Sequence, residues 1–405
     1  MEIGFVSFNQ EALNRANKVM KLLQGEGAID ELGMGRIRDM FSNMMFPGMS
    51  VLQTRAKYFL LMPSLYASLE RTRIADSRIA RQKIREYEIS ITRRLMEGSP
   101  GEAGIIGADS IGRGSGYVKY DPAYIYQAGM ETYGLVRCSG NLYAMLAERS
   151  SLYANTPSKQ TGNEDCGDDS DDLAGFEPCF LSCDEVYGFN GKEPLAITLT
   201  RKEAEFLRHR IVATQPNSLL GYILDNELYY LADVKTFEEL DKPLHNAVTP
   251  DLYRIYKLAL RYSRFANLLR MRYSILYDLG VDANDAAIEL SRKFEYYLHE
   301  YAEELTPDAI NEILALTLGR VTDRSSIDFC RDAVRALSFD DNFETLDRLI
   351  VLREQTIKGP RRSKLINSKD FEKGKPFELS APMAFRWNTI VRTTINDIRE
   401  GLDHE

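Results

Sequence analysis

Short polar and basic residues recur at helical spacing between Asp30 and Met62, and this spacing suits contact with DNA. Asp30–Met45 predicts one helix, Pro47-Gly48 predicts a turn, and Ser50–Met62 predicts a second helix whose polar positions follow i, i+3, i+4 and i+7. Such a helix is typical of one that enters the major groove, although its polar face could equally lie in water. The candidate DNA contacts on it are Ser50, Gln53, Thr54, Arg55 and Lys57.

Local positive charge continues in the stretch Ser64–Glu97, although the whole chain has a net charge of −9. This stretch holds eight basic and five acidic residues. A helix with this excess of positive charge could follow a phosphate backbone. Alternatively, its charges pair with one another on a solvated helix.

Two further basic sites lie in the second half of the chain. The helix predicted over Pro250–Leu279 places Arg254, Lys257, Arg261 and Arg264 in one narrow sector, with Arg272. The next predicted helix is acidic, so the alternative is that the two helices neutralise each other. In Lys358–Lys364 the Gly-Pro pair prevents a helix and keeps four charges, including Arg361 and Arg362, in an extended loop. Both sites are candidate nucleic-acid contacts.

Residue types that carry catalysis or bind metal form no recognisable pattern. His209, His245, His299 and His404 lie in no nucleophile elbow, zinc-binding pair or Cys/His signature. Cys166, Cys179 and Cys183 have no neighbouring histidine, and Asn163–Asp172 lacks the ligand order of a calcium loop. The glycine-rich stretch Gly107–Gly116 matches neither a P-loop nor a dinucleotide fingerprint. We expect no catalytic site, no metal and no cofactor.

The cellular compartment follows from cysteine usage and from the distribution of apolar residues. The chain has five cysteines, an odd number with no CxxC pair, which favours a reducing compartment over a disulfide framework. Its first residues lack the basic start and cleavage site of a signal peptide, and no stretch is long and apolar enough to span a bilayer. We predict a cytoplasmic protein that does not bind membranes.

The spacing of apolar residues and helix caps predicts a mainly α-helical protein. Helices are expected from Asn9 onward through a domain at residues 1–155, which would hold a helix-turn-helix or winged-helix-like piece at 30–62. Residues 163–172 contain six acidic residues in ten, so we predict that residues 156–193 form an acidic, mobile linker. We predict that residues 194–405 form a C-terminal helical bundle, whose first helix starts just before Arg201.

Several segments together resemble a bacterial family known only as a domain of unknown function, and the resemblance runs over nearly the whole chain. It implies no activity, cofactor or catalytic residue, and it suggests a genomic setting among defence genes, beside helicases and nuclease-like proteins. The acidic run at 163–172 departs from the family. The segments that carry the resemblance are Asp30–Asp39, Phe46–Gly48, Gln53–Arg55, Tyr58–Leu60, Gly104–Gly107, Leu199–Leu207, Lys358–Arg362 and the ending from Arg386 to Leu402.

These observations predict a non-enzymatic subunit of a bacterial anti-phage defence complex that binds or positions DNA. Two alternatives remain. One is a scaffold or adaptor that binds only protein partners, such as the helicase or nuclease of the complex. The other is an enzyme, for example a nuclease, built from scattered acidic residues, although catalytic carboxylates need fixed positions that an acidic linker does not provide.

Overall fold

The computed structural model describes residues 30–111, 117–137, 141–155, 179–183, 191–321, 323–339 and 342–404 of the 405-residue protein. Within these ranges the protein is mainly α-helical, and its only β-type pairing is an isolated bridge between Val136 and Phe180. The predicted mainly α-helical class is confirmed within these ranges. The helix predicted from Asn9 and the acidic run 163–172 lie outside the described residues.

The chain forms two compact units, and each is built from two stretches of sequence. Unit 1 contains Met1–Met45 and Thr236–Phe385, and unit 2 contains Phe46–Lys235 and Arg386–Glu405. Most of the predicted linker, residues 156–193, lies outside the described part of the chain, so its role as a boundary stays a prediction. The two helices of the predicted helix-turn-helix are divided between the units, because α2 belongs to unit 1 and α3 to unit 2.

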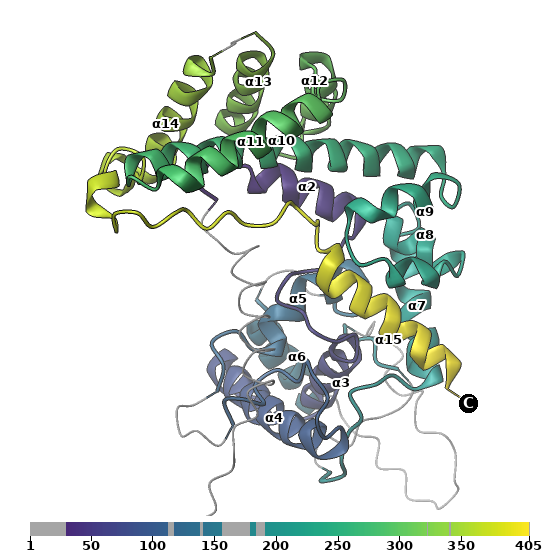
Figure 1. Cartoon of the computed structure of the whole chain (residues 1–405). Coiled ribbons are helices and arrows are strands. Elements are labelled where there is room, and N and C mark those ends of the chain that lie inside the picture. Colours follow the sequence, from purple (N-terminus) through teal and green to yellow (C-terminus); the bar gives the residue numbers. More distant parts are fainter. Residues whose placement is uncertain are drawn as a thin grey trace, which may run out of the picture. The chain divides into compact units, whose positions relative to one another are not determined.

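Unit 1 is arranged around one long helix, α10, which is 31 residues long and packs against α2, α11, α12 and α14 (Figure 1). Thr249 caps it through the Leu252 N–H, and Pro250 occupies its first position, where the missing N–H costs nothing. The helices of this unit are α2 (Gly35–Met45), α9 (Asp241–His245), α10 (Pro250–Gly280), α11 (Asn284–Glu300), α12 (Pro307–Leu316), α13 (Arg324–Phe339) and α14 (Glu344–Lys358), with short helical turns η2 (Glu238–Leu240), η3 (Pro360–Arg362) and η4 (Ser368–Asp370).

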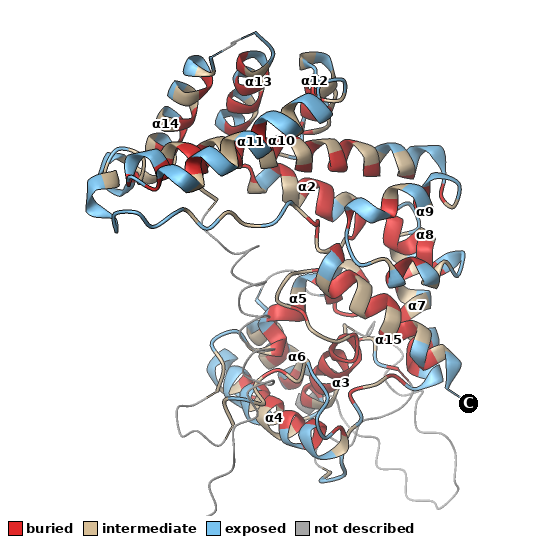
Figure 2. Cartoon of the chain, in the orientation of Figure 1, coloured by how far each residue is buried: buried red, intermediate tan, exposed pale blue. Residues whose placement is uncertain are grey.

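Unit 2 is arranged around α3, which packs against α4, α5, α6 and α7. Eleven of the 13 residues of α3 are buried, and Figure 2 shows this burial along the helix. A helix that is apolar on all sides belongs in the centre of a unit. The helices of this unit are α3 (Tyr58–Glu70), α4 (Ser77–Gly98), α5 (Pro122–Thr132), α6 (Leu142–Asn155), α7 (Arg201–Thr214), α8 (Leu219–Asp225) and α15 (Arg392–Asp403), with η1 (Tyr229–Asp233) and η5 (Trp387–Val391).

Pro63 lies inside α3, where the sequence predicts that one helix ends and another begins at Ser64. That prediction is wrong: α3 continues through Pro63 to Glu70, and α4 begins at Ser77. The proline removes one backbone hydrogen bond, but burial of the surrounding residues stabilises the helical path. The separate start of α4 follows from Asp76, whose carboxylate accepts hydrogen bonds from the N–H groups of Arg78 and Ile79.

Candidate nucleic-acid interface

The segment Ser50–Lys57 forms a series of turns, and α3 begins only at Tyr58. The prediction of a helix from Ser50 is therefore wrong. Gln53 explains the difference, because its side chain closes the turn: Oε1 accepts the Ser50 N–H at 2.9 Å and Nε2 donates to the Gly48 carbonyl at 3.0 Å. Gln53 is 5% exposed, so its amide is not presented to a DNA base.

The other residues of this segment that were predicted to contact DNA also bind groups inside unit 2. Lys57 Nζ lies 2.6 and 2.7 Å from the two carboxylate oxygens of Glu203, and both side chains are buried. Arg55 Nε donates to Asp397 at 2.9 Å, and the Thr54 hydroxyl donates to the Gly104 carbonyl at 2.6 Å. The expected outward polar face is thus an inward one.

The basic stripe on α10 is neutralised by carboxylates of unit 1. Arg254 and Arg261 lie 2.7 and 3.7 Å from Glu312 of α12, and Lys257 lies 2.9 Å from Asp241 of α9. The acidic partners therefore come mainly from α9 and α12, whereas the sequence places them on the helix after α10. This pairing leaves the stripe with little free charge for phosphate.

Arg264 and Arg272, the remaining arginines of the stripe, are the most strongly held. Arg264 contacts Glu304 at 2.5 Å and Glu238 at 2.8 Å. Although burial lowers the pKa of Arg264, the hydrogen bonds to these carboxylates raise it above its ordinary value. Arg272 makes two hydrogen bonds to Asp347 of α14, at 2.6 and 2.7 Å. Such bidentate pairs position helices and are poorly suited to exchange for a phosphate.

Arg361 and Arg362 lie in η3 and are exposed. Arg362 Nε donates to the Lys358 carbonyl at 2.8 Å. The sequence predicts an extended loop here, but Pro360–Arg362 is a single 3-10 turn, because Pro360 fixes a backbone angle that also suits the first position of a helical turn. These two arginines stay available to a phosphate or an acidic surface.

A more exposed basic surface lies on α4, which Figure 2 shows with exposed residues along one side. Arg78, Arg81 and Arg85 fall within about 60° of one another around the helix axis, at about 100° per residue. All three are exposed. Of these, only Arg78 forms an ion pair within the described residues, with Asp76 at 4.0 Å. We call this set the α4 arginine face.

Aromatic rings accompany the α4 arginine face. The guanidinium of Arg81 lies 5.8 Å from the ring centre of Tyr143 on α6, and that of Arg85 lies 5.9 Å from the ring of Tyr117. These distances suit cation–π contacts. The sequence did not single out either tyrosine, because each is separated by more than thirty positions from its arginine and no local pattern joins them.

A second aromatic group follows Tyr117 along the chain. The rings of Tyr120 and Tyr124 stack with centroids 5.3 Å apart, and Lys119 Nζ lies 5.0 Å from the ring of Tyr120. Tyr124 is 61% exposed and Tyr120 is 42% exposed. The two rings therefore form an adjacent, partly exposed aromatic pair on unit 2.

Tyr117 is held in place from two directions. Its ring packs against Gly107, where an added Cβ would lie 2.7 Å from the ring, and its hydroxyl is 3.3 Å from the Thr92 hydroxyl of α4. Burial raises the pKa of Tyr117, and Glu88 adds to the rise, so the phenol is neutral at pH 7. The ring therefore presents an uncharged face beside Arg85.

No group of three or more His, Cys, Asp or Glu side chains that could hold a metal ion is found in the described ranges. Cys179 is a free thiol there and Cys183 is buried, whereas Cys166 lies outside these ranges. No helix in the part of the chain that the structure describes is long and apolar enough to cross a membrane.

The first part of the chain has recognisable relatives. Residues 2–156 match a family of unknown function, DUF6361. This match confirms the predicted resemblance to an uncharacterised family over these residues, which include α4 and the aromatic residues beside it, and it assigns no activity. No curated protein and no solved structure matches the chain. A resemblance beyond residue 156 and a setting among defence genes stay predictions.

Proposed function

We propose that this protein is a non-enzymatic subunit that binds or positions nucleic acid, and that the α4 arginine face is its contact surface. The observation that carries the proposal is the exposure of Arg78, Arg81 and Arg85 on one side of α4, beside neighbouring tyrosine rings. The proposal keeps DNA as the partner and moves the contact away from residues 50–57. It does not require a helix-turn-helix.

Charge supports a contact with the phosphate backbone. A chain with a net charge of −9 is repelled by nucleic acid at long range, so binding needs a local region of positive charge. The arginines of α4 supply such a region, and Arg71 and Arg73, both exposed, precede the helix. Each phosphate that an arginine neutralises releases a counterion, which makes the affinity depend on salt.

The aromatic residues favour a single strand over a duplex. Unpaired bases stack on exposed rings, and a stacked base contributes about 1–3 kcal/mol to binding. Tyr120 and Tyr124 already stack on each other, and Lys119 lies over one of the two rings. In a duplex the bases are stacked internally and cannot use these rings, so only the phosphate contribution would remain.

A scaffold that binds only proteins is the second candidate, and exposed apolar side chains of unit 1 favour it. Leu318 is 76% exposed, Phe339 is 80% exposed and Leu352 is 60% exposed. Large exposed apolar side chains are typical of partner surfaces when they form one patch. A cytoplasmic complex with a helicase or nuclease is compatible with either candidate.

Fluorescence anisotropy with labelled single-stranded and duplex DNA, at several salt concentrations, tests the proposal. In the test variant, Arg78, Arg81 and Arg85 are replaced by glutamine. We expect the affinity for single strands to fall about tenfold or more and the logarithmic salt slope to decrease by about two units, since each lost phosphate contact removes about 0.7. Tyr124→Ala should weaken single-strand binding without changing the slope.

A matched control removes the same charge elsewhere. Lys202, Lys235 and Arg348 are exposed and lie on other elements, so replacing all three by glutamine should leave the affinity and the salt slope nearly unchanged. If both triple variants weaken binding equally, the effect comes from net charge and not from the α4 arginine face. If the wild-type protein binds neither form of DNA at low salt, the scaffold becomes the better account.

A further inference from the structure

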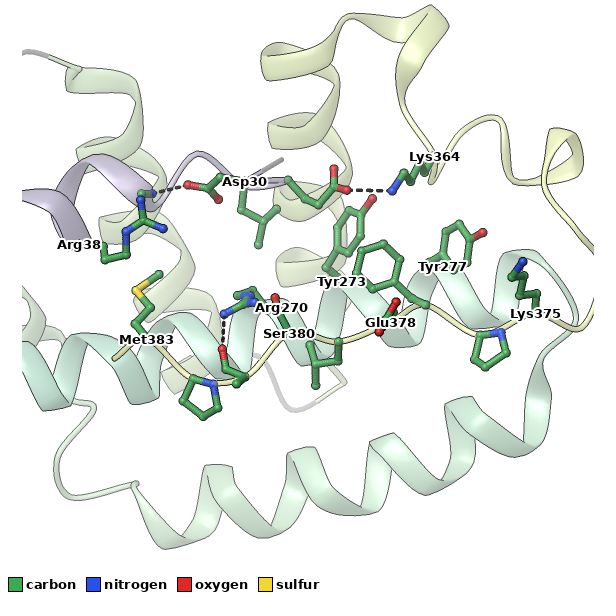
Figure 3. Close-up of a pocket in the computed structure, with 18 residues that line it drawn as sticks. Asp30, Arg38, Arg270, Tyr273, Tyr277, Lys364, Lys375, Glu378, Ser380 and Met383 are labelled. Atoms are coloured by element: carbon green, nitrogen blue, oxygen red, sulfur yellow. Dashed lines mark hydrogen bonds and ion pairs between the residues drawn. The ribbon is translucent and has the colours of Figure 1, made fainter. Parts of the chain in front are cut away.

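Unit 1 contains a cavity of about 420 Å³, a size that suits a small organic ligand. Its walls come from four parts of the unit: the residues before and at the start of α2, the second half of α10, the loop after α14, and the extended segment Lys375–Met383 (Figure 3). The cavity lies wholly inside unit 1 and is separate from the α4 arginine face, which belongs to unit 2.

Arg270 is one of four cations that line this cavity. It projects from α10, and one guanidinium nitrogen donates to the Ala381 carbonyl at 3.1 Å (Figure 3). Among the described residues no carboxylate lies within ion-pair distance of it. Burial lowers the pKa of Arg270, Asp30 opposes the change, and Arg38 adds to it. A partly buried guanidinium with several remaining N–H donors is stabilised by an anion that compensates its charge.

The other cations of the cavity wall have carboxylate partners, and Arg38 lies 2.9 Å from Asp39. Lys364 lies 3.0 Å from Glu31, and Lys375 lies 2.9 Å from Glu372. The carboxylate of Asp30 accepts the Gly35 N–H at the start of α2. Arg270 is therefore the one cation of the wall that forms no ion pair among the described residues, although the carboxylate of Glu378 also lines the cavity.

Aromatic rings form the wall next to Arg270. The ring of Phe377 lies 5.2 Å from that of Tyr273 and 5.3 Å from that of Tyr277, both in edge-on contact. The Tyr273 hydroxyl donates to Glu354 at 2.7 Å, so it offers the cavity its ring and not its polar end. A ligand placed next to Arg270 would meet its guanidinium and an apolar, aromatic surface.

The walls are held in place independently of any ligand. The Phe377 N–H donates to Asp278 at 2.6 Å, and the Ser263 hydroxyl donates to the Met383 carbonyl at 3.1 Å. These two bonds fasten the segment Lys375–Met383 to α10 near both of its ends. A preformed cavity of this kind loses little conformational entropy when a ligand enters.

We infer that this cavity binds a small aromatic or apolar anion, with its phosphate or carboxylate on Arg270 and its ring against Tyr273, Tyr277 and Phe377. A guanidinium forms two parallel hydrogen bonds with either kind of oxyanion, so the headgroup is defined by its charge and shape. The ring surface explains why the ligand is an organic anion and not an inorganic ion alone.

Calorimetric titration of the full chain with 1-naphthyl phosphate and 1-naphthoate tests the inference, and 1-naphthol serves as their neutral counterpart. We expect one binding site for at least one anion, with 1-naphthol at least tenfold weaker. Arg270→Met should weaken anion binding by about 10- to 100-fold, the usual range for a charge-assisted hydrogen bond. The two anions distinguish a phosphate from a carboxylate ligand.

A measurement without ligand separates this role from a structural one. Removing a partly buried charge that has no ion-pair partner should raise the unfolding temperature of ligand-free Arg270→Met, whereas loss of a purely structural arginine would lower it. Arg254→Met, on the exposed part of α10, and the triple glutamine variant of the α4 arginine face should leave anion affinity unchanged. The inference is overturned if neither anion binds the wild-type chain, if 1-naphthol binds as well as the anions, or if Arg270→Met binds as tightly as wild type.

Discussion

Replacing Lys57 by methionine removes one half of an ion pair inside unit 2. The Lys57 side chain is 4% exposed and that of Glu203 is 0% exposed. Lys57 Nζ contacts both Glu203 oxygens and the Thr198 carbonyl, at 2.6, 2.7 and 3.2 Å. Methionine has a similar length and no charge, so it fills the space of the lysine side chain while leaving the carboxylate without its counter-charge.

The size of the effect follows from the burial of the pair. Loss of one partner from a buried ion pair costs about 3–5 kcal/mol, since the remaining charge stays desolvated. Glu203 keeps the hydrogen bond from the Thr200 N–H at 2.8 Å, which reduces the loss only in part. Against a total stability of about 5–15 kcal/mol, the variant should be severely destabilised.

Trp387 supplies the assay. It is the single tryptophan of the chain, it is fully buried, and it belongs to unit 2, so its fluorescence reports the unfolding of that unit in urea. Arg201→Met is a matched control, because the Arg201–Glu205 pair lies in the same unit with side chains 60% and 55% exposed. Such a surface pair contributes about 0–1 kcal/mol.

The double variant tests the cause. Adding Glu203→Gln to Lys57→Met removes the stranded charge, so we expect a coupling energy of about 0.5–3 kcal/mol between the two positions. A loss of less than about 1 kcal/mol in Lys57→Met would refute the argument from burial. If that variant kept its stability and lost DNA affinity, the prediction of an outward recognition helix from Ser50 to Met62 would again be the better account.

Two further predictions concern buried carboxylates. Burial raises the pKa of Asp397 to about 6, although Arg55 opposes the rise. Between about pH 4 and pH 6 the folded state therefore holds a proton that the unfolded state releases. The stability of unit 2 should fall by about 3 kcal/mol as the pH rises over this range. Asp397→Asn should flatten this dependence in urea titrations followed by Trp387, and a slope of the opposite sign would contradict it. Glu354, fully buried, accepts hydrogen bonds from Tyr273, Ser363 and the backbone of Lys364; Glu354→Gln should cost about 1–3 kcal/mol by circular dichroism in urea, and no change would contradict it.

Helix starts were predictable because their signals are local. Thr200 and Glu203 form a reciprocal cap at the start of α7, and Asp121 caps α5 before Pro122. Each of these contacts joins residues at most three positions apart, so the residue types alone indicate it. The helix predicted over Pro250–Leu279 agrees with α10, Pro250–Gly280, to within one residue at its end.

The candidate nucleic-acid residues were predicted less well, because the polar face of a helix can either be exposed or pack against another part of the protein. A charged side chain can be solvated by water or paired with a residue inside the protein, and both cases produce the same sequence pattern. Lys57 pairs with a residue 146 positions away, and Arg55 with one 342 positions away. Helical periodicity contains no information on such distant pairs. The composition of Ser64–Glu97 indicated the positive charge of α4. It did not indicate that arginines of α4 lie beside Tyr117 and Tyr143.

By itself, the sequence determined the helical class, most helix starts and the excess of basic residues around α4. These depend on contacts within one or two helical turns and on residue type. Tertiary structure alone decided which charges are neutralised and which are free. It turned Gln53 and Lys57 inward and paired Arg264 with Glu304. It left Arg81 exposed and Arg270 partly buried at a cavity, with no ion pair among the described residues. The physical reason is that the free energy of a charge depends on its surroundings, and those surroundings come from segments far apart in the chain.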